Sequence, residues 1–338
     1  MSFSELLLLA LLATAGFPAL APAELRLIKL ATLAPENSNW IKALRALDLD
    51  LRQQTGQELG LKIYPGGVQG DEEVMIRKLQ IGQLQAVAFG GLGVSQTCSE
   101  VLALEIPFTF DRYDEVDYVL AQTREFYRRA YEARGLVLLG WMDIGFIHIL
   151  SQKPIRTAED ARGMKVWRLE GEPITKVVFT RAGMTSVPLT IPDVLMGLET
   201  NMIEVVYASP SAAIALQWFT RVKCLTTLPI NFTPGALLID KQVFYSLPPT
   251  QQDLLRQLAD QYLQRQLQQN RKENTEAMQV MQANGLQLVS PLPADVQGFE
   301  QLVQDSLPEL VGHAFSQAAY DLVQATLAAF RQQQLHAR

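Results

Sequence analysis

The sequence has few of the residues that build metal sites and disulfide frameworks. Its 338 residues include two cysteines, Cys98 and Cys224, and three histidines, at positions 148, 313 and 336. The histidines are far apart in the sequence and never four residues from one another, so no metal site is expected from them. The cysteines either form one disulfide or remain two separate buried thiols, and the sequence leaves both alternatives open.

The sequence also lacks a surplus of positive charge and the glycine motifs of nucleotide sites. It carries 29 Lys and Arg against 35 Asp and Glu, a formal net charge of −6, which argues against the basic face that nucleic acids require. The segment Gly90-Gly91-Leu92-Gly93 follows a predicted strand but does not match the dinucleotide fingerprint. The segment 93–97 lacks the last glycine of a nucleophile elbow. We therefore expect no cofactor and no hydrolase chemistry.

Long hydrophobic runs are absent except at the start of the chain. Residues 6–15 are LLLLALLATA, and Ala21-Pro22-Ala23 follows as an A-x-A-like cleavage site. The apolar run to Ala21 is shorter than the roughly 20 residues of a membrane span. We expect a signal peptide over residues 1–23 that is cleaved near Ala23, and a periplasmic location, although residues 1–5 carry no Lys or Arg.

What the sequence does contain is an alternation of strand and helix patterns in two series. In the first series, Asn37 or Ser38 and then Asp71 are placed as helix N-caps directly before amphipathic segments. This order of elements predicts a parallel sheet with right-handed crossovers. The first series comprises strands at 25–33, 61–64 and 86–89 and helices at 39–55, 71–81, 95–104 and 113–134. The second comprises strands at 165–169, 185–189 and 205–208 and helices at 174–182, 192–200 and 212–222.

Extended segments and one long helix connect the two series. The extended segments are predicted at 136–141, 144–150 and 223–239. Pro248-Pro249 begins a helix predicted over about 249–284, and its middle, at 268–276, is almost wholly polar. A helix that is polar all round usually bridges two bodies. Two further helices, at about 294–310 and 315–333, are expected to close the chain.

Aromatic residues collect at the positions where open α/β sheets bind ligands. Most of them lie at or just after the carboxyl end of a predicted strand, or at the start of a helix. Each one either lines a ligand site or packs in the core, and Trp141, Trp167 and Tyr207 are the strongest candidates for ligand contact. The residues concerned are Trp40, Phe89, Trp141, Phe146, Trp167, Tyr207, Trp218 and Phe232.

Several short segments resemble, in order, parts of the substrate-binding proteins of tripartite ATP-independent periplasmic (TRAP) transporters. The segment ATLAPENSNW at 31–40 resembles the opening strand and loop of that family. Each segment is short, but the ordered set extends over about residues 27–330. The other matching segments are 63–67 (IYPGG), 70–73 (GDEE), 106–108 (IPF), 153–155 (KPI), 163–166 (GMKV) and 198–204 (LETNMIE).

The resemblance implies an α/β protein of the periplasmic binding protein type II-like fold, with two α/β domains joined by hinge strands. One domain is expected at 24–142 together with about 224–250, and the other at 143–223. The long helix at 249–284 is expected to span both domains, and residues 285–338 to form C-terminal helices. The resemblance further implies a cleft that closes on one small-molecule ligand, and a closed form that docks on membrane permease subunits. No catalytic residue and no metal is implied.

The sequence departs from this family where members that bind organic acids carry arginines. An Arg that clamps the ligand carboxylate typically follows the strand matching 163–166, but Trp167 stands there, one residue before Arg168. A one-residue step along a strand points the side chain to the opposite face. Ile147 occupies a second position that often carries Arg. Because Arg pairs with carboxylates in a bidentate way, we expect a ligand with a large apolar surface rather than a small dicarboxylate.

The candidate ligand-binding residues combine an apolar wall with a few polar groups. Asp143, Arg168, Glu170 and Ser209 are expected to orient a polar end of the ligand. The remaining candidates are Trp40, Phe89, Gly90, Trp141, Ile147, Trp167, Tyr207 and Phe232.

A further partner and two alternative functions stay open. The segment Lys165–Pro173 resembles a subgroup of the family that is associated with an additional periplasmic helical-repeat protein. The first alternative function is a periplasmic enzyme using the same cleft, which needs an acid or base with a perturbed pKa, such as Asp143 or Glu170. The second is a sensory module that presents its ligand to a receptor, and neighbouring permease genes would argue for transport instead.

Overall fold

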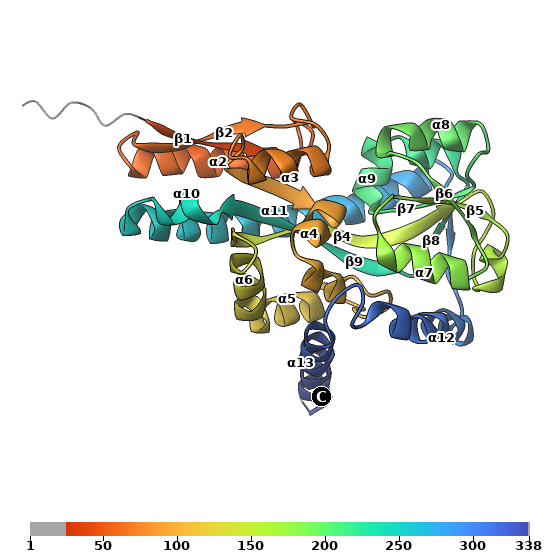
Figure 1. The fold of residues 1–338 in the computed structure, drawn as a ribbon. Helices are drawn as coiled ribbons and strands as arrows, with labels where there is room; N and C mark the ends of the chain where they lie inside the picture. Colours follow the sequence, from red (N-terminus) through yellow and green to blue (C-terminus); the bar gives the residue numbers. More distant parts are fainter. Residues whose placement is uncertain (1–24, 337–338) are drawn as a thin grey trace, which may run out of the picture.

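The computed structural model describes residues 25–336 and has the α/β architecture expected from the sequence (Figure 1). The leader predicted at 1–23 lies outside these residues. The strands form one ten-stranded sheet, in the order β2-β1-β3-β9-β4-β7-β5-β6, with β8 beside β4 and β10 beside β8. Between residues 25 and 336, no helix has the length and apolar character needed to cross a membrane.

The first lobe, by which we mean strands β1–β3 and helices α2–α4, follows the predicted alternation. Ser38 accepts a hydrogen bond from the Ile41 N–H at 3.4 Å, and Asp71 accepts one from the Val74 N–H at 2.8 Å. These caps fix where the two helices begin, and β1 pairs in parallel with β2 and β3. The elements are β1 (Arg26–Ala31), α2 (Asn39–Gln54), β2 (Leu59–Tyr64), α3 (Glu72–Gln80), β3 (Ala86–Gly90) and α4 (Gly91–Thr97).

The second lobe, by which we mean strands β5–β7 and helices α7–α9, repeats the same pattern. Its strand β5 pairs in parallel with β6 and β7. Figure 1 shows the lobes at opposite ends of the molecule, with long strands running between them. The elements are β5 (Lys165–Arg168), α7 (Pro173–Arg181), β6 (Thr185–Pro188), α8 (Val194–Glu199), β7 (Val205–Ala208) and α9 (Pro210–Ala215), with 3-10 turns η2 (Glu159–Ala161), η3 (Ile191–Asp193) and η4 (Trp218–Arg221).

Two long strands, β4 (Leu136–Ser151) and β9 (Asn231–Asp240), connect the lobes. β9 is antiparallel to β3 and β4, and β4 is antiparallel to β7. The sheet is therefore mixed, which corrects the purely parallel sheet expected from the alternation, because the chain returns from the second lobe between β3 and β4. The predicted segments 136–141 and 144–150 are one strand, with a register shift between Asp143 and Gly145. Gly145 has φ of +101°, which side chains rarely allow.

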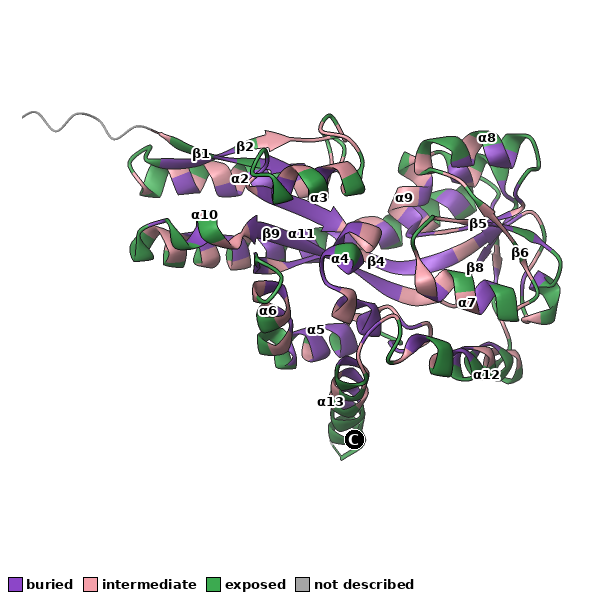
Figure 2. Cartoon of the chain, in the orientation of Figure 1, coloured by how far each residue is buried: buried purple, intermediate pink, exposed green. Residues whose placement is uncertain are grey.

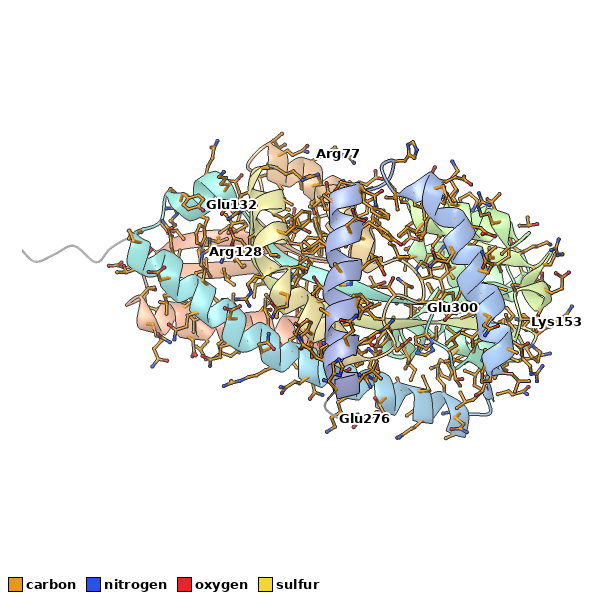
Figure 3. The ribbon with its side chains drawn as sticks, turned by 90° about the horizontal axis from the view of Figure 1, so that it is seen from below. Arg77, Arg128, Glu132, Lys153, Glu276 and Glu300 are labelled. Atoms are coloured by element: carbon orange, nitrogen blue, oxygen red, sulfur yellow. The ribbon has the colours of Figure 1, made fainter. Side chains whose placement is uncertain are left out.

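The long helix α11 (Pro249–Ala283) runs along both lobes, as seen from below in Figure 3. It packs against α2 and β4 and, farther along, against α9. The predicted helices near the end of the chain are α12 (Pro293–Leu310) and α13 (Gln317–His336). The sequence did not predict α10 (Lys241–Tyr245) or β10 (Gln287–Val289), because elements this short carry too little periodicity. The remaining short strand is β8 (Cys224–Thr226).

The hydrophobic cores cover both faces of the central strands, which Figure 2 shows as buried.

The helix predicted at 113–134 is two helices, α5 (Tyr113–Gln122) and α6 (Arg124–Glu132), divided at Thr123. The helix predicted at 95–104 is the end of α4 followed by the 3-10 helix η1 (Ser99–Leu104). Cys98 and Cys224 are both buried and free, so of the two alternatives the structure has the separate thiols.

Candidate functional site

The two lobes meet where the loop after β5 approaches α4. A Cβ atom added to Gly171 would lie 3.4 Å from Leu92 Cδ1 and 3.5 Å from Gln96 Nε2, both on α4. Open α/β sheets bind ligands in the crevice outside the carboxyl ends of their strands. β3 ends at Gly90 and β5 ends at Arg168, so the meeting of the lobes brings two such ends together. We call this junction of the two lobes the crevice, and it is the candidate ligand site.

Three glutamates from different parts of the chain lie in the walls of this crevice. Glu72 begins α3, Glu105 follows η1, and Glu172 directly precedes α7. Each keeps some solvent-accessible surface, although protein atoms surround its carboxyl group almost completely. Within residues 25–336, no cluster of His, Cys, Asp or Glu has the arrangement of a metal site.

Glu72 is held by the backbone at the start of α4. Its Oε1 accepts a hydrogen bond from the Gly90 N–H at 3.2 Å, and its Oε2 accepts one from the Gly93 N–H at 2.8 Å. Burial nevertheless raises the pKa of Glu72 to about 7, and the charge of Glu172 adds to this effect. The protein's own carboxylate therefore occupies the backbone donors that a ligand anion would otherwise use.

Glu172 is held by hydroxyl groups of the second lobe. Its Oε2 accepts hydrogen bonds from the Tyr207 hydroxyl at 2.5 Å and from the Thr175 hydroxyl at 3.2 Å. Burial raises the pKa of Glu172, whereas the nearby charge of Arg168 lowers it. The half-buried Arg168 lies at the end of β5, and its charge acts on the carboxyl group of Glu172.

Glu105 is the least satisfied of the three carboxyl groups. Its Oε1 is buried and has no hydrogen-bond partner among the described residues. Burial raises the pKa of Glu105 well above its ordinary value, and the charges of Glu172 and Glu72 raise it further.

An apolar wall stands beside the glutamates. A Cβ added to Gly90 would lie 2.3 Å from Ile144 Cδ1, and one added to Gly235 would lie 2.6 Å from Trp40 Cη2. Both glycines are thus needed to make room for these two side chains, which are half-buried. Trp40 and Ile144 are thus two apolar side chains beside the crevice, and the indole ring of Trp40 is of the kind that packs against a ring.

Four of the residues expected from the sequence lie at this crevice: Trp40, Gly90, Arg168 and Tyr207. Trp40 and Gly90 belong to the first lobe and lie near Glu72, whereas Arg168 and Tyr207 belong to the second and lie near Glu172. Whether they contact a ligand remains a prediction.

Trp167 was expected in the apolar wall of the site, but in the structure it lies in the core of the second lobe. Its side chain is 4% exposed and packs on Tyr207 and Trp218, with ring centroids 4.8 and 5.0 Å apart. Its indole N–H donates to the Leu189 carbonyl at 2.9 Å. A tryptophan with a partnered N–H and aromatic rings on two sides belongs to the core of the second lobe.

Other candidates also lie in cores or away from the crevice. Phe89, Trp141 and Phe232 belong to the core that packs against α5 and α6, where Trp141 is edge-on to Tyr127 at 5.4 Å. Ile147 and Ser209 are buried, and Glu170 is exposed. Period-2 alternation identifies which strand residues share a face, but it does not say which face the ligand uses.

Asp143 lies on β4, in the segment that the sequence predicts to be a hinge and that we call the hinge, and is held by α11. It has no exposed surface, and its Oδ2 accepts a hydrogen bond from Arg271 Nε at 2.9 Å. Arg271 also forms two hydrogen bonds with Asp117 of α5, at 2.6 and 2.8 Å, and lies over the Tyr113 ring. Burial raises the pKa of Asp143 to about 6, against the opposing effect of Arg271. This carboxylate therefore belongs to the connection between lobes.

Glu72, Glu105 and Glu172 are not predicted from the sequence as site residues. Acidic residues are common in the first turn of helices because they favour the helix dipole, so nothing distinguished Glu72 from its neighbours Asp71 and Glu73. Glu172 lies two residues from Glu170, which was proposed instead. The one feature of the sequence that could have identified Glu172 as a site residue is its position, since it closely follows the end of a strand.

Comparison with known proteins gives consistent matches along the chain. Residues 30–312 match the DctP model, described as bacterial extracellular solute-binding protein, family 7. The 2,3-diketo-L-gulonate-binding periplasmic protein of Escherichia coli is 25% identical over 65% of this chain and 67% of its own length.

Solved structures with the same fold cover most of the chain. A TRAP periplasmic solute-binding protein from Citrobacter koseri with bound D-glucuronate is 25% identical, covers 88% of this chain and 98% of its own, and has a TM-score of 0.78. A TRAP periplasmic solute-binding protein from Xanthobacter autotrophicus with bound β-D-galacturonate is 20% identical, with 89% and 99% covered and a TM-score of 0.81. The fold is therefore that of the periplasmic solute-binding proteins, as the sequence predicted.

Proposed function

The chain belongs to family 7 of the bacterial extracellular solute-binding proteins, and we propose that it captures a small molecule between its lobes for delivery to a TRAP membrane permease. The observation that carries this proposal is that Glu72 of the first lobe and Glu172 of the second lobe are close enough for the charge of Glu172 to raise the pKa of Glu72. The two lobes are then the hinged domains, and residues 1–23 the leader that directs export to the periplasm.

The lining of the crevice favours a ligand with several hydroxyl groups and one carboxylate. Carboxylate oxygens accept hydrogen bonds from hydroxyls, and three of the crevice residues are glutamates. Trp40 offers a flat face for a ring, and Arg168 offers the cation for a carboxylate. The C. koseri and X. autotrophicus proteins hold glucuronate and galacturonate, which are ligands of this chemistry.

This proposal replaces the mostly apolar ligand that the sequence led us to expect. That expectation was based on Trp167 and Ile147, which stand where acid-binding relatives carry Arg. Both side chains are buried in the protein. The groups near the crevice are instead three glutamates and Arg168, and such polar groups favour a ligand that is itself polar.

Titration calorimetry with D-glucuronate, D-glucose and a long-chain fatty acid tests the proposal. We expect D-glucuronate to bind, D-glucose to bind more weakly, and the fatty acid not to bind. Arg168→Ala should weaken glucuronate binding by about 10- to 100-fold, the range expected for a charge-assisted hydrogen bond, and should affect glucose little. Arg162→Ala, at an exposed position of the same lobe, is the control. Tight binding of the fatty acid with no response to glucuronate would contradict the proposal.

An enzyme that uses the residues named from the sequence is less favoured by where those residues lie. Asp143 is paired with Arg271 at the hinge and Glu170 is exposed, so the acid or base named for an enzyme is not at the crevice. Recovery of unchanged glucuronate after incubation with the protein would support binding without turnover. The helical-repeat partner expected from Lys165–Pro173 stays a prediction, and co-purification with neighbouring gene products would test it.

A further inference from the structure

The polar middle of α11 lies against the strand that joins the lobes. Three amide side chains there, those of Gln266, Asn270 and Asn274, are at most 6% exposed. A buried amide is costly unless its donor and acceptor are both used. The partners of these amides therefore indicate what the polar stretch of this helix is for.

Asn274 joins two parts of the molecule through one amide group. Its Oδ1 accepts hydrogen bonds from the Ser211 N–H at 3.0 Å and from the Ser211 hydroxyl at 2.7 Å. Its Nδ2 donates to the Ile144 carbonyl at 3.1 Å. Ser211 lies in the first turn of α9 in the second lobe, whereas Ile144 lies on β4 between the lobes.

The contact with Ser211 replaces a helix cap. The first N–H groups of a helix have no partner inside the helix and need an acceptor. Ser209, the N-cap of α9, makes no side-chain capping hydrogen bond. Asn274 supplies an acceptor from another helix instead, and so fastens the start of α9 to α11.

The hydrogen bond from Asn274 to the Ile144 carbonyl holds the backbone of a residue in the crevice wall. The Ile144 carbonyl also accepts a hydrogen bond from Asn270 Nδ2 at 3.2 Å. Asn270 in turn contacts Asn39, which precedes Trp40. The Ile144 side chain lies against Gly90 beside the crevice, so its position depends on the amides that hold its backbone.

We propose that Asn274 is a positioning residue for ligand capture: it holds Ile144 at the crevice wall and fastens the second lobe to α11 through Ser211. This inference deepens the proposed function, since it rests on two lobes that move relative to one another. Gly145 fits the same scheme, because a Cβ there would lie 2.7 Å from Asn274 Nδ2.

Two substitutions at this position separate its two contacts. Asn274→Ala removes both the acceptor for Ser211 and the donor for Ile144. Asn274→Asp keeps an acceptor for Ser211 but cannot donate to the Ile144 carbonyl. Lys272→Ala, at an exposed position of the same helix, is the matched control.

The readouts do not need a ligand. Spin labels on the substitutions Ile81→Cys and Met196→Cys, at exposed positions of the two lobes, report the distribution of lobe separations. The native cysteines are buried and do not compete for label. Amide hydrogen exchange at Ser211 reports the capping contact directly.

In Asn274→Ala we expect exchange at Ser211 to rise by about tenfold, as for loss of a buried hydrogen bond, and the lobe separations to broaden. In Asn274→Asp we expect slow exchange at Ser211 but a broadened distribution, because Ile144 is released. Wild-type distributions in both variants would overturn the proposal, as would a uniform rise in exchange over the whole chain, which marks a merely structural role. Neither result depends on the glucuronate titration, so the two proposals can fail separately.

Discussion

Buried carboxylates are held in two different ways, at the hinge and in the crevice. At the hinge, Asp143 pairs with Arg271, which also pairs with Asp117. In the crevice, Glu72 and Glu172 accept hydrogen bonds from backbone N–H and hydroxyl groups, which carry no charge. The difference is that Asp143 is ion-paired with a cation inside the protein, whereas the crevice carboxylates accept their hydrogen bonds from neutral groups.

Burial acts on both kinds of carboxylate, but its consequences differ. It raises the pKa of Asp143 to about 6 and that of Glu72 to about 7. A buried ion pair loses much stability when one partner is removed, because an uncompensated charge stays behind. A carboxyl group without a cation takes up a proton more readily instead. The free energy of unfolding should therefore respond most strongly to mutation at the hinge, whereas the crevice should make it depend on pH.

The largest expected effect is that of Arg271→Met, which removes the cation beside Asp143. We expect the free energy of unfolding to fall by about 3–5 kcal/mol, the usual cost of breaking a buried ion pair. The loss should be larger at pH 8 than at pH 5, because Asp143 can be protonated at the lower pH. Urea unfolding at both pH values measures it.

A second substitution checks the cause of that loss. Adding Asp143→Asn to Arg271→Met removes the unpaired charge, and we expect it to restore part of the lost stability at pH 8. A double variant no more stable than Arg271→Met alone would mean that lost packing of Arg271 on Tyr113, rather than charge, causes the effect.

A smaller effect is expected from pH in the protein without substitutions. The folded-state pKa of Glu72 lies above its ordinary value of 4.5, so the folded protein binds more protons than the unfolded chain between pH 4.5 and about 7. The stabilising contribution is complete below pH 4.5 and is lost as the pH rises through 7. Glu105 and Glu172, whose pKa values are also raised, add in the same direction.

The substitution Glu72→Gln tests how much of this pH dependence of stability is due to Glu72. It keeps an acceptor for the backbone of α4 but cannot ionise, so the fall in unfolding free energy between pH 5 and pH 7 should become shallower. Thermal unfolding over that range measures the slope. Glu73→Gln, at the exposed neighbouring position, should leave the slope unchanged. An equal effect of both substitutions would mean that surface charge, rather than the crevice, sets the pH dependence.

Most of the fold could be predicted from local signals in the sequence. The caps Ser38 and Asp71 begin helices where expected, and the proline pair at 248–249 begins α11. The division at Thr123 and the antiparallel course of β9 depend on long-range packing, which local patterns do not contain. The polar stretch of α11 correctly indicated a helix in contact with both lobes.

The candidate site was only partly predictable, because the sequence does not say which face of a strand meets the ligand. Trp167 and Arg168 are neighbours on β5, yet one is in the core and the other beside the crevice. Glu105 follows a 3-10 helix and faces its partners only because η1 packs beneath α4. Such convergence of distant segments follows from tertiary structure alone.

The smallest expected effect sharpens the comparison with an ion pair of similar length that is exposed. Arg129 and Glu125 form an ion pair at 2.8 Å, close to the 2.9 Å of Arg271 and Asp143, but their side chains are 78% and 64% exposed. Water already solvates both charges, so Arg129→Ala should change the free energy of unfolding by less than about 0.5 kcal/mol. Urea unfolding beside Arg271→Met measures the difference. Comparable losses in the two variants would mean that burial does not set the value of the hinge pair, and the distinction between hinge and crevice would lose its basis.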